Sequence, residues 1–375
     1  MLVIIFQNKM STLACVTKIV VSVLFVVATF GFCLVLYGVR DQSLQQLSFL
    51  HVGQNNGGLQ EHCFFKINVF FLKVPKCASG TTMVLLWRFV MTHNLNPLIN
   101  PNSPPKLHPR KSYNVLATHM KYDINNNAIS EIMPNNTTYI AIVREPKTRF
   151  QSLLIKKNEY SKMRQEAPLN ARNTTDGELL LRTIQKNPER FNYILNTQTR
   201  YFGIRADSPE ADMKKVFSTF DLIMIADYYD ESLVLLKRHM CWDLKDIIYT
   251  KKHVQHYSPD QKNVMLHPVI RAWFSERNYN DNVFYRKCLN EFNRKVSNEG
   301  DAFHQEVEFF QSVLRKTDLF CSSGLDQLLY FEPSRWNRSF NISTNDCKLL
   351  NLDTEWSIHF VENWQRSKPK QPRGT

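Results

Sequence analysis

The sequence lacks the signatures of the common nucleotide-dependent and metal-dependent enzymes. No Gly-Lys-Ser or Gly-Lys-Thr occurs in its 375 residues, which argues against an ordinary P-loop kinase or ATPase with a GxxxxGK[ST] loop. DxD, HExxH and CxxC sequences are also missing, and their absence argues against a metal-dependent glycosyltransferase or a metalloprotease. We therefore expect a site whose chemistry requires no metal ion.

Internal repeats, heptad arrays and low-complexity interruptions are absent from the main part of the chain. Residues 63–364 are enough for one large domain. Residues 365–375 contain basic residues and prolines but no acidic residue, so we expect a flexible basic tail there.

Charged residues are missing from a long stretch near the N-terminus. The 21 residues 19–39, between Lys18 and Arg40, are all uncharged. As a helix they extend about 31 Å, which is enough to cross the hydrocarbon core of a bilayer. The run is longer than the apolar region of a usual signal peptide, and no small-residue cleavage site follows it. We therefore expect a transmembrane signal anchor rather than a cleaved signal peptide.

The charges beside this run predict its orientation. Lys9 and Lys18 precede it without an acidic residue, so the positive-inside rule predicts a cytosolic segment at 1–18, a luminal stem at 40–62 and a luminal domain after it. Glycosylation acceptor sequences agree with a luminal location, and they begin at Asn135, Asn136, Asn173, Asn337 and Asn341. The sequence thus predicts a single-pass type II membrane protein.

The expected luminal part is basic and contains six of the eight cysteines. The net charge of +13 favours an anionic nucleotide or an anionic glycan as partner, and a luminal location argues against nucleic acid. The sequence does not determine how the six cysteines pair, and they are Cys63, Cys77, Cys241, Cys288, Cys321 and Cys347. If Cys77 keeps a free thiol, one other cysteine must also be unpaired.

The stretch from Asn68 to Phe89, NVFFLKVPKCASGTTMVLLWRF, contains two apolar segments and a polar loop between them. The first segment predicts a buried strand of a parallel sheet, and apolar residues after Gly80 recur at helical spacing. The loop combines Lys76, hydroxyl side chains and the backbone N–H groups of a helix N-terminus, which together favour binding of an anion. The alternative is a plain strand-turn-helix corner whose polar residues face solvent.

A second stretch, TYIAIVREPKTRFQSLL at 138–154, has the same arrangement. Its apolar start predicts a strand that ends before Pro146, followed by a helix. Arg144 then lies at the carboxyl end of the strand and Ser152 lies on the helix, where both can bind a phosphate.

The alternative for the arginines of this stretch is a surface ion pair. Arg144 and Arg149 could pair with Glu145 or Glu159, and such pairs contribute little to stability. Two separate anion sites instead match a donor with two distant anionic groups.

The two loops resemble the donor-binding loops of sulfotransferases that use PAPS (3'-phosphoadenosine 5'-phosphosulfate). From roughly Phe71 to Cys321 the chain resembles the galactose 3-O-sulfotransferase family, including FDLIMIADYYDESLVLLKRHMCWDLKDIIY at 220–249 and NDNVFYRKCLNEFNRKV at 280–296. The resemblance implies an α/β, P-loop-like sulfotransferase fold in which helices flank a central, mainly parallel sheet, preceded by one transmembrane helix.

The resemblance also implies roles for individual residues. The 3'-phosphate of PAPS would contact Arg144 and Ser152, Lys76 would be catalytic as well as donor-binding, and the 5'-phosphosulfate would lie on the first loop: Lys76, Cys77, Ala78, Ser79, Gly80, Thr81 and Thr82. The loop departs from the family at Cys77 and Gly80, where we expect Thr and Ser in vertebrate members.

A base for the acceptor hydroxyl is implied between the two loops. The segment VLATHM predicts a short strand that ends at His119. In the related uronyl 2-O-sulfotransferases a histidine at the matching place is the base, and a near-neutral pKa suits this role. The alternatives are His108, His253, His256 and, less suited beside an arginine, Glu145.

The expected function is that of a type II Golgi membrane sulfotransferase. It would move the sulfuryl group from PAPS to a sugar hydroxyl, first of all the 3-OH of galactose on a glycolipid or a glycoprotein glycan. The alternatives are a glycosaminoglycan O-sulfotransferase and a catalytically silent luminal glycan-binding protein.

Overall fold

The structure, a computed structural model, describes residues 63–99, 113–125, 128–250, 258–324 and 327–368. The chain divides into two units, Met1–Phe65 and Lys66–Thr375, and all described helices and strands belong to the second unit. The expected segments 1–18, 19–39 and 40–62 lie outside the described residues. Within the described ranges, no helix has the length and apolar character needed to span a membrane.

A five-stranded parallel sheet forms the centre of the second unit, with the strand order β2-β3-β1-β4-β5. The strands are β1 (Val69–Leu72), β2 (Pro97–Leu98), β3 (Val115–Thr118), β4 (Thr138–Val143) and β5 (Leu222–Ile225). Their apolar sequences are continuous because both faces of the sheet are covered, and β1 and β5 are buried along their whole length. The expected α/β fold with a parallel sheet is confirmed.

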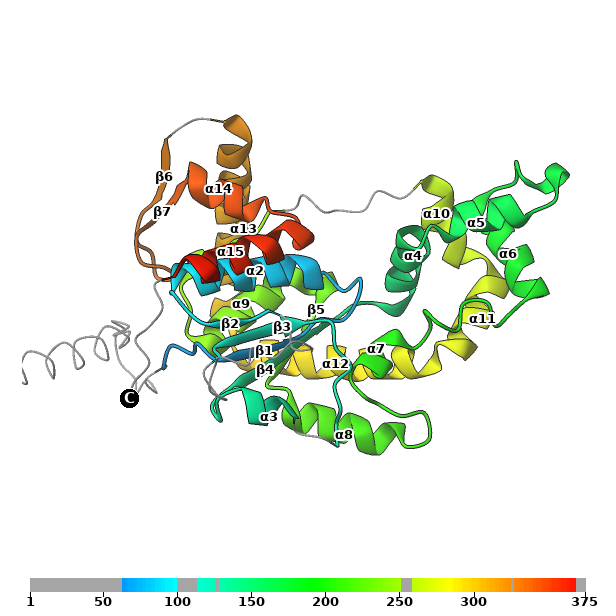
Figure 1. Cartoon of the computed structure of the whole chain (residues 1–375), viewed down its shortest axis with the longest axis horizontal. Helices are drawn as coiled ribbons and strands as arrows, with labels where there is room; N and C mark the ends of the chain where they lie inside the picture. Colours follow the sequence, from blue (N-terminus) through cyan, green and yellow to red (C-terminus); the bar gives the residue numbers. More distant parts are fainter. Residues whose placement is uncertain (1–62, 100–112, 126–127, 251–257, 325–326, 369–375) are drawn as a thin grey trace, which may run out of the picture. The chain divides into compact units, whose positions relative to one another are not determined.

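Helices lie on both faces of this sheet. Figure 1 shows α2 (Ser79–Thr92) and α15 (Thr354–Ser367) on one side and α12 (Tyr279–Asn298) on the other. The remaining helices are α3 (Ala128–Ile132), α4 (Pro146–Lys156), α5 (Glu159–Glu166), η1 (Leu169–Ala171), α6 (Asp176–Lys186), α7 (Thr197–Tyr201), α8 (Pro209–Thr219), η2 (Ala226–Tyr228), α9 (Tyr229–Met240), η3 (Leu244–Ile247), α10 (Pro259–Asn263), η4 (Val264–Leu266), α11 (Pro268–Arg277), α13 (Asp301–Ser323) and α14 (Thr344–Leu350).

The two long helices α12 and α13 are joined at Gly300. Gly300 has a φ of 70°, a left-handed conformation that glycine adopts without steric cost. Phe284, Phe303 and Phe310 on their inner faces are fully buried. The inner faces of α12 and α13 therefore belong to the core.

The C-terminal part of the chain packs back on the sheet domain. An antiparallel hairpin of β6 (Leu328–Phe331) and β7 (Phe340–Ser343) precedes α14 and α15, and a disulfide joins Cys321 to Cys347. Helix α15 ends at Ser367, so the chain remains helical past the expected start of the tail at 365. Residues 369–375 lie outside the described residues. Cys77 and Cys288 carry free thiols.

A buried carboxylate, that of Asp281 in α12, joins three helices. Its oxygens accept hydrogen bonds from the backbone N–H of Gln198 at 3.1 Å and of Thr199 at 2.8 Å, both in α7. The guanidinium of Arg149 in α4 donates to it at 3.3 Å, and both side chains of this ion pair are fully buried. The sequence alternative of a surface pair between Arg149 and Glu145 or Glu159 is therefore wrong.

We expect removal of this carboxylate to destabilise the fold strongly. Asp281→Ala would leave the Arg149 charge buried without a counter-charge, because Nε and Nη1 of Arg149 have no partner in the described part of the chain. The expected loss in the free energy of unfolding is about 3–5 kcal/mol, measured by urea denaturation. As a matched control, Glu291→Ala breaks partly exposed pairs with Arg294 and Lys295 and should cost under about 1 kcal/mol. Equal losses for the two variants would contradict the role assigned to Asp281.

Candidate active site

The loops that follow β1, β3 and β4 meet at one edge of the sheet. These strands are neighbours, with Leu72 of β1 opposite Thr118 of β3 and Ala141 of β4. All three run in the same direction, so their carboxyl ends lie together. Ligands of open α/β sheets bind at this edge. It carries Lys76 after β1, His119 after β3 and Arg144 after β4.

The backbone of the β1–α2 loop is shaped to bind an anion. Lys76 and Ala78 have φ values of 63° and 57°, whereas Cys77 between them does not have a positive φ. Alternation of left-handed with ordinary conformations turns successive N–H groups toward one point and forms an anion-binding concavity. Helix α2 begins with no side-chain cap and no acidic residue in its first turn. Its first N–H groups and its dipole therefore favour an anion.

Three side chains of the loop point inward and hold its shape. The hydroxyl of Ser79 donates to the carbonyl of Val74 at 2.6 Å, and the hydroxyls of Thr82 and Tyr229 share a hydrogen bond of 3.1 Å. Cys77 is fully buried, and burial raises the pKa of its thiol to about 12. Cys77 and Ser79 can thus offer a ligand their backbone N–H groups, whereas the N–H of Thr82 donates to the carbonyl of Ala78 at 3.2 Å.

The accessible groups of the loop are Lys76 and Thr81, both half-buried. The hydroxyl of Thr81 has no hydrogen-bond partner among the described residues. Gly80 lies against Thr354 at the start of α15.

Four cations surround the loop without a carboxylate partner in the described ranges: Lys73, Lys76, Arg144 and Lys156. Burial lowers the pKa of Lys76, and the charges of Lys156 and Arg144 lower it further. Arg144 also contacts the loop directly, because its Nη1 donates to the carbonyl of Lys76 at 3.3 Å. Uncompensated cations that repel one another attract an anion strongly.

His119 is arranged as a neutral base. Its Nδ1 lies 2.7 Å from the carbonyl oxygen of Lys73. A carbonyl only accepts, so Nδ1 carries the proton and Nε2 keeps a free lone pair. His119 is exposed at the sheet edge, and partial desolvation of its ring, followed by the nearby Lys73 ammonium, lowers its pKa to about 4. The imidazole is therefore uncharged at neutral pH. The ring of Tyr201 lies edge-on, with its centroid 6.2 Å from that of His119.

Lys73 is a site residue that the sequence reasoning missed. It follows directly after β1, only 5% of it is exposed, and burial lowers its pKa to about 8. The available signal was a lysine immediately after an apolar strand, a position that buries a charge at the sheet edge.

The loop after β4 presents Arg144 and buries Ser152. Arg144 is half-buried, whereas Ser152 is 1% exposed, so Arg144 is the more accessible of the two expected phosphate ligands. The carboxylate of Glu145 accepts the N–H of Thr148 at 2.8 Å and caps helix α4. This contact gives Glu145 a structural role.

A second missed residue, Gln198, connects the two loops. Its side-chain amide accepts from the N–H of Arg144 at 2.9 Å and donates to the carbonyl of the same residue at 3.0 Å. The same amide oxygen accepts from the thiol of Cys77 at 3.4 Å. Gln198 is fully buried. It therefore fixes the backbone of Arg144 relative to the β1–α2 loop.

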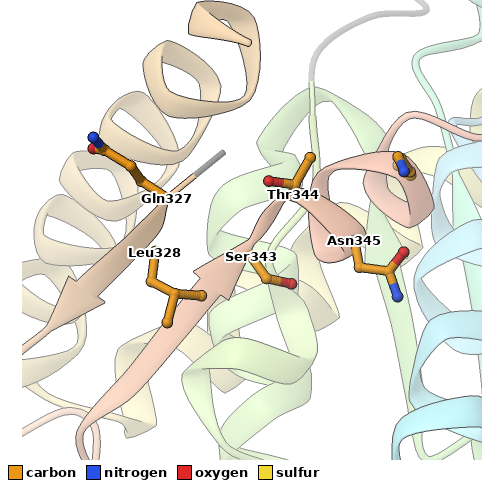
Figure 2. Close-up of a pocket in the computed structure, with 6 residues that line it drawn as sticks. Gln327, Leu328, Ser343, Thr344 and Asn345 are labelled. Atoms are coloured by element: carbon orange, nitrogen blue, oxygen red, sulfur yellow. The ribbon is translucent and has the colours of Figure 1, made fainter. Parts of the chain in front are cut away.

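Other candidate features lie elsewhere. His108, His253 and His256 fall outside the described residues. A cavity of about 430 Å³ is lined by residues of the β6–β7 hairpin and α14, including Leu328, Ser343 and Thr344 (Figure 2), and none of its lining residues belongs to the loops after β1, β3 or β4. Within the part of the chain that the structure describes, no group of His, Cys, Asp or Glu side chains is suited to hold a metal ion.

The buried charge of Lys73 yields a prediction about stability. Lys73→Met keeps the length of the side chain and removes the cost of burying an ammonium, so it should raise the free energy of unfolding by roughly 1–3 kcal/mol at pH 7. Because the folded-state pKa of Lys73 is lowered to about 8 from 10.5, the cost is present below pH 8 and disappears as the pH rises through 10.5. The advantage of the variant should vanish over this interval.

Urea denaturation at several pH values measures this effect. The control is Lys214→Met, since Lys214 is exposed on α8 and its replacement should change the free energy of unfolding by less than about 0.5 kcal/mol. A Lys73→Met variant that is less stable than the parent at pH 7 would refute the argument.

Comparison with known proteins identifies a family and several relatives of this chain. A family model described as galactose-3-O-sulfotransferase matches residues 1–329. Galactose-3-O-sulfotransferase 3 from Homo sapiens is 32% identical in an alignment of 210 residues that covers 49% of this chain and 47% of the human protein. The protein of the same name from Bos taurus is 30% identical over 263 residues, 63% of this chain and 59% of the bovine protein.

Galactosylceramide sulfotransferase from Homo sapiens is 26% identical over 298 residues, 72% of this chain and 67% of that protein. The chain thus spans 47% to 59% of the length of the two galactose-3-O-sulfotransferases above. The matched family model covers most of the chain, including both anion loops and His119. The chain belongs to the galactose-3-O-sulfotransferase family.

Proposed function

We propose that this protein transfers the sulfuryl group of PAPS to a hydroxyl of galactose. The observation that carries the proposal is the group of unpaired cations around an uncapped helix N-terminus, next to a neutral histidine. An anion-binding loop alone would fit many ligands. A candidate base at the neighbouring strand end, in a chain of this family, supports transfer of an anionic group to a hydroxyl.

The residues have distinct roles in this reaction. Nε2 of His119 accepts the proton of the sugar hydroxyl while the hydroxyl oxygen forms its bond to sulfur. The bond from sulfur to the bridging phosphate oxygen breaks, and the product is adenosine 3',5'-bisphosphate. Lys76 and the N–H groups of the loop stabilise the charge that grows on this leaving oxygen. The chemistry resembles phosphoryl transfer in relying on position and electrostatics.

The far end of the donor is held by the loop after β4. Arg144 can bind the 3'-phosphate through its guanidinium, and Ser152 on α4 is proposed as a second ligand of this group. Contacts of both anionic groups of the donor with this sheet edge would orient the sulfur toward His119.

The acceptor is proposed as the 3-OH of galactose on a glycolipid or a glycoprotein glycan. Support comes from the relatives, since their names specify galactose and galactosylceramide. We place the reaction at the luminal face of the Golgi membrane in a type II protein. The uncharged run at 19–39 and the glycosylation acceptor sequences support this location.

We expect the full-length chain to transfer radiolabelled sulfate from PAPS to β-galactosides. Lys76→Ala should lower kcat by about 10²–10³-fold, because it removes charge stabilisation in the transition state. His119→Ala should lower kcat by about 10²–10⁴-fold through loss of the base. His359→Ala, which changes an exposed histidine of α15, is the matched control and should leave kcat unchanged.

The acceptor panel should also include glycosaminoglycans and neutral glycans. Transfer to glycosaminoglycans alone would replace galactose as the proposed acceptor. Activity that survives His119→Ala would assign the base to another group. Glycan binding without any transfer or binding of adenosine 3',5'-bisphosphate would favour the silent glycan-binding alternative.

Gln198 gives a separate prediction about the donor. Gln198→Met removes its hydrogen bonds to Arg144 without leaving a large cavity, so the 3'-phosphate contact should weaken and the KM for PAPS should rise about 10–100-fold. Adenosine 5'-phosphosulfate lacks the 3'-phosphate, so its KM should change much less. Steady-state kinetics with the two donors measure this difference.

The control for Gln198→Met is Gln311→Met. Gln311 donates to Asp230 at 3.1 Å and lies outside both anion loops. The Gln311→Met variant should therefore have the same KM as the parent for both donors. Equal effects of Gln198→Met on the two donors would mean that Gln198 supports the fold in general rather than the position of Arg144.

A further inference from the structure

Helix α15 lies beyond the end of the family match at residue 329 and yet borders the candidate active site. Near its C-terminal end, Gln365 donates to the side chain of Asn96 at 3.0 Å, and Lys368 donates to the carbonyl of Leu95 at 2.9 Å. Near its start, Thr354 lies against Gly80. The helix therefore runs parallel to α2, and it begins at the anion-binding loop (Figure 1).

The contact between Thr354 and Gly80 is unusually close. A Cβ atom on Gly80 would lie 2.7 Å from Oγ1 of Thr354, closer than real Cβ contacts allow. Gly80 does not have a positive φ, so its backbone does not require glycine. The hydroxyl of Thr354 therefore occupies the space that a side chain of residue 80 would fill.

We propose that Thr354 donates a hydrogen bond to the 5'-phosphosulfate of the donor, at the place left open by Gly80. This inference rests on the proposed function. The hydroxyl of Thr354 has no hydrogen-bond partner among the described residues. It is held beside the first turn of α2, whose N–H groups lack a side-chain cap. A hydroxyl in this position can donate to a phosphate or sulfate oxygen.

The group of α15 that would contact the 5'-phosphosulfate is the hydroxyl of Thr354, and the backbone N–H groups at the N-terminus of α15 are already used. The carboxylate of Asp353 accepts the N–H groups of Glu355 and Trp356 at 2.8 and 2.9 Å. This cap satisfies the start of α15 with a negative charge. The N-terminus of α15 is therefore not available to a second anion.

The segment before Thr354 is held in place on two sides. The disulfide between Cys321 and Cys347 attaches α14 to α13. The hydroxyl of Thr250 donates to the carbonyl of Leu350 at 3.0 Å. Thr354 follows four residues after Leu350, so its position is fixed before a ligand arrives.

The test compares Thr354→Val with Thr354→Ser in the full-length chain. Valine keeps the shape and removes the hydroxyl, so the Kd for adenosine 3',5'-bisphosphate should rise about 10–100-fold. Serine keeps the hydroxyl and should stay within about 3-fold of the parent. Isothermal titration calorimetry gives the Kd, and thermal unfolding shows whether either variant is destabilised.

Nucleotides with one phosphate show which end of the donor Thr354 contacts. Thr354→Val should weaken binding of adenosine 5'-monophosphate and leave adenosine 3'-monophosphate unchanged. Gly80→Ser should weaken binding in the parent and restore it in a Thr354→Ala background, because the new hydroxyl then has room at the same place. Restoration would support a role in binding, since a packing role alone would not require a hydroxyl from either residue.

The outcomes separate this inference from the proposed function. A Thr354→Val variant that binds adenosine 3',5'-bisphosphate like the parent would overturn the inference and leave the proposed function intact. Equal weakening for the 5'- and 3'-monophosphates would also overturn it, because the change would then be a general loss of structure. A parent chain that does not bind the bisphosphate would overturn the proposed function itself.

Discussion

The buried carboxylate of Asp281 is the contact on which the candidate site depends. Lys76, Arg144 and Lys156 repel one another. Contacts in the core must therefore hold the loops that carry them in place. Asp281 provides such contacts, because it joins α4, α7 and α12 inside the core. Gln198 of α7 then connects this part of the core to both anion loops, through its hydrogen bonds with Cys77 and Arg144. The spacing of the cations is thus determined by contacts that no ligand touches.

At this edge of the sheet, the features that would bind an anion lower the stability of the fold. Unpaired cations and a buried lysine cost free energy in the absence of a ligand, and an anion that binds there offsets part of this cost. The left-handed residues Lys76 and Ala78 add backbone strain. Both costs occur where an anion would bind. Elsewhere most buried charges are paired, as Arg238 is with Glu306.

The sequence predicted the features that depend on residues close together in the chain. Apolar runs placed β1, β3 and β4, and the residues after each run placed Lys76, His119 and Arg144 at one edge. It failed where the deciding contact joins distant segments. Arg149 follows a strand loop and looks exposed, but Asp281 approaches it from 132 residues away. Gln198 carries no motif, because its role comes only from the backbone groups that the fold brings to it.

The contact between Gly80 and Thr354 shows why a shared loop motif does not describe a whole site. The loop lies within the family match, whereas the hydroxyl beside it comes from a helix beyond that match. A glycine in the loop then appears as a loss when the motif is compared alone. By the inference above, the hydroxyl of Thr354 takes the place that a side chain of residue 80 would fill. Donor binding by such a chain has to be judged from the neighbours of the loop as well as from its sequence.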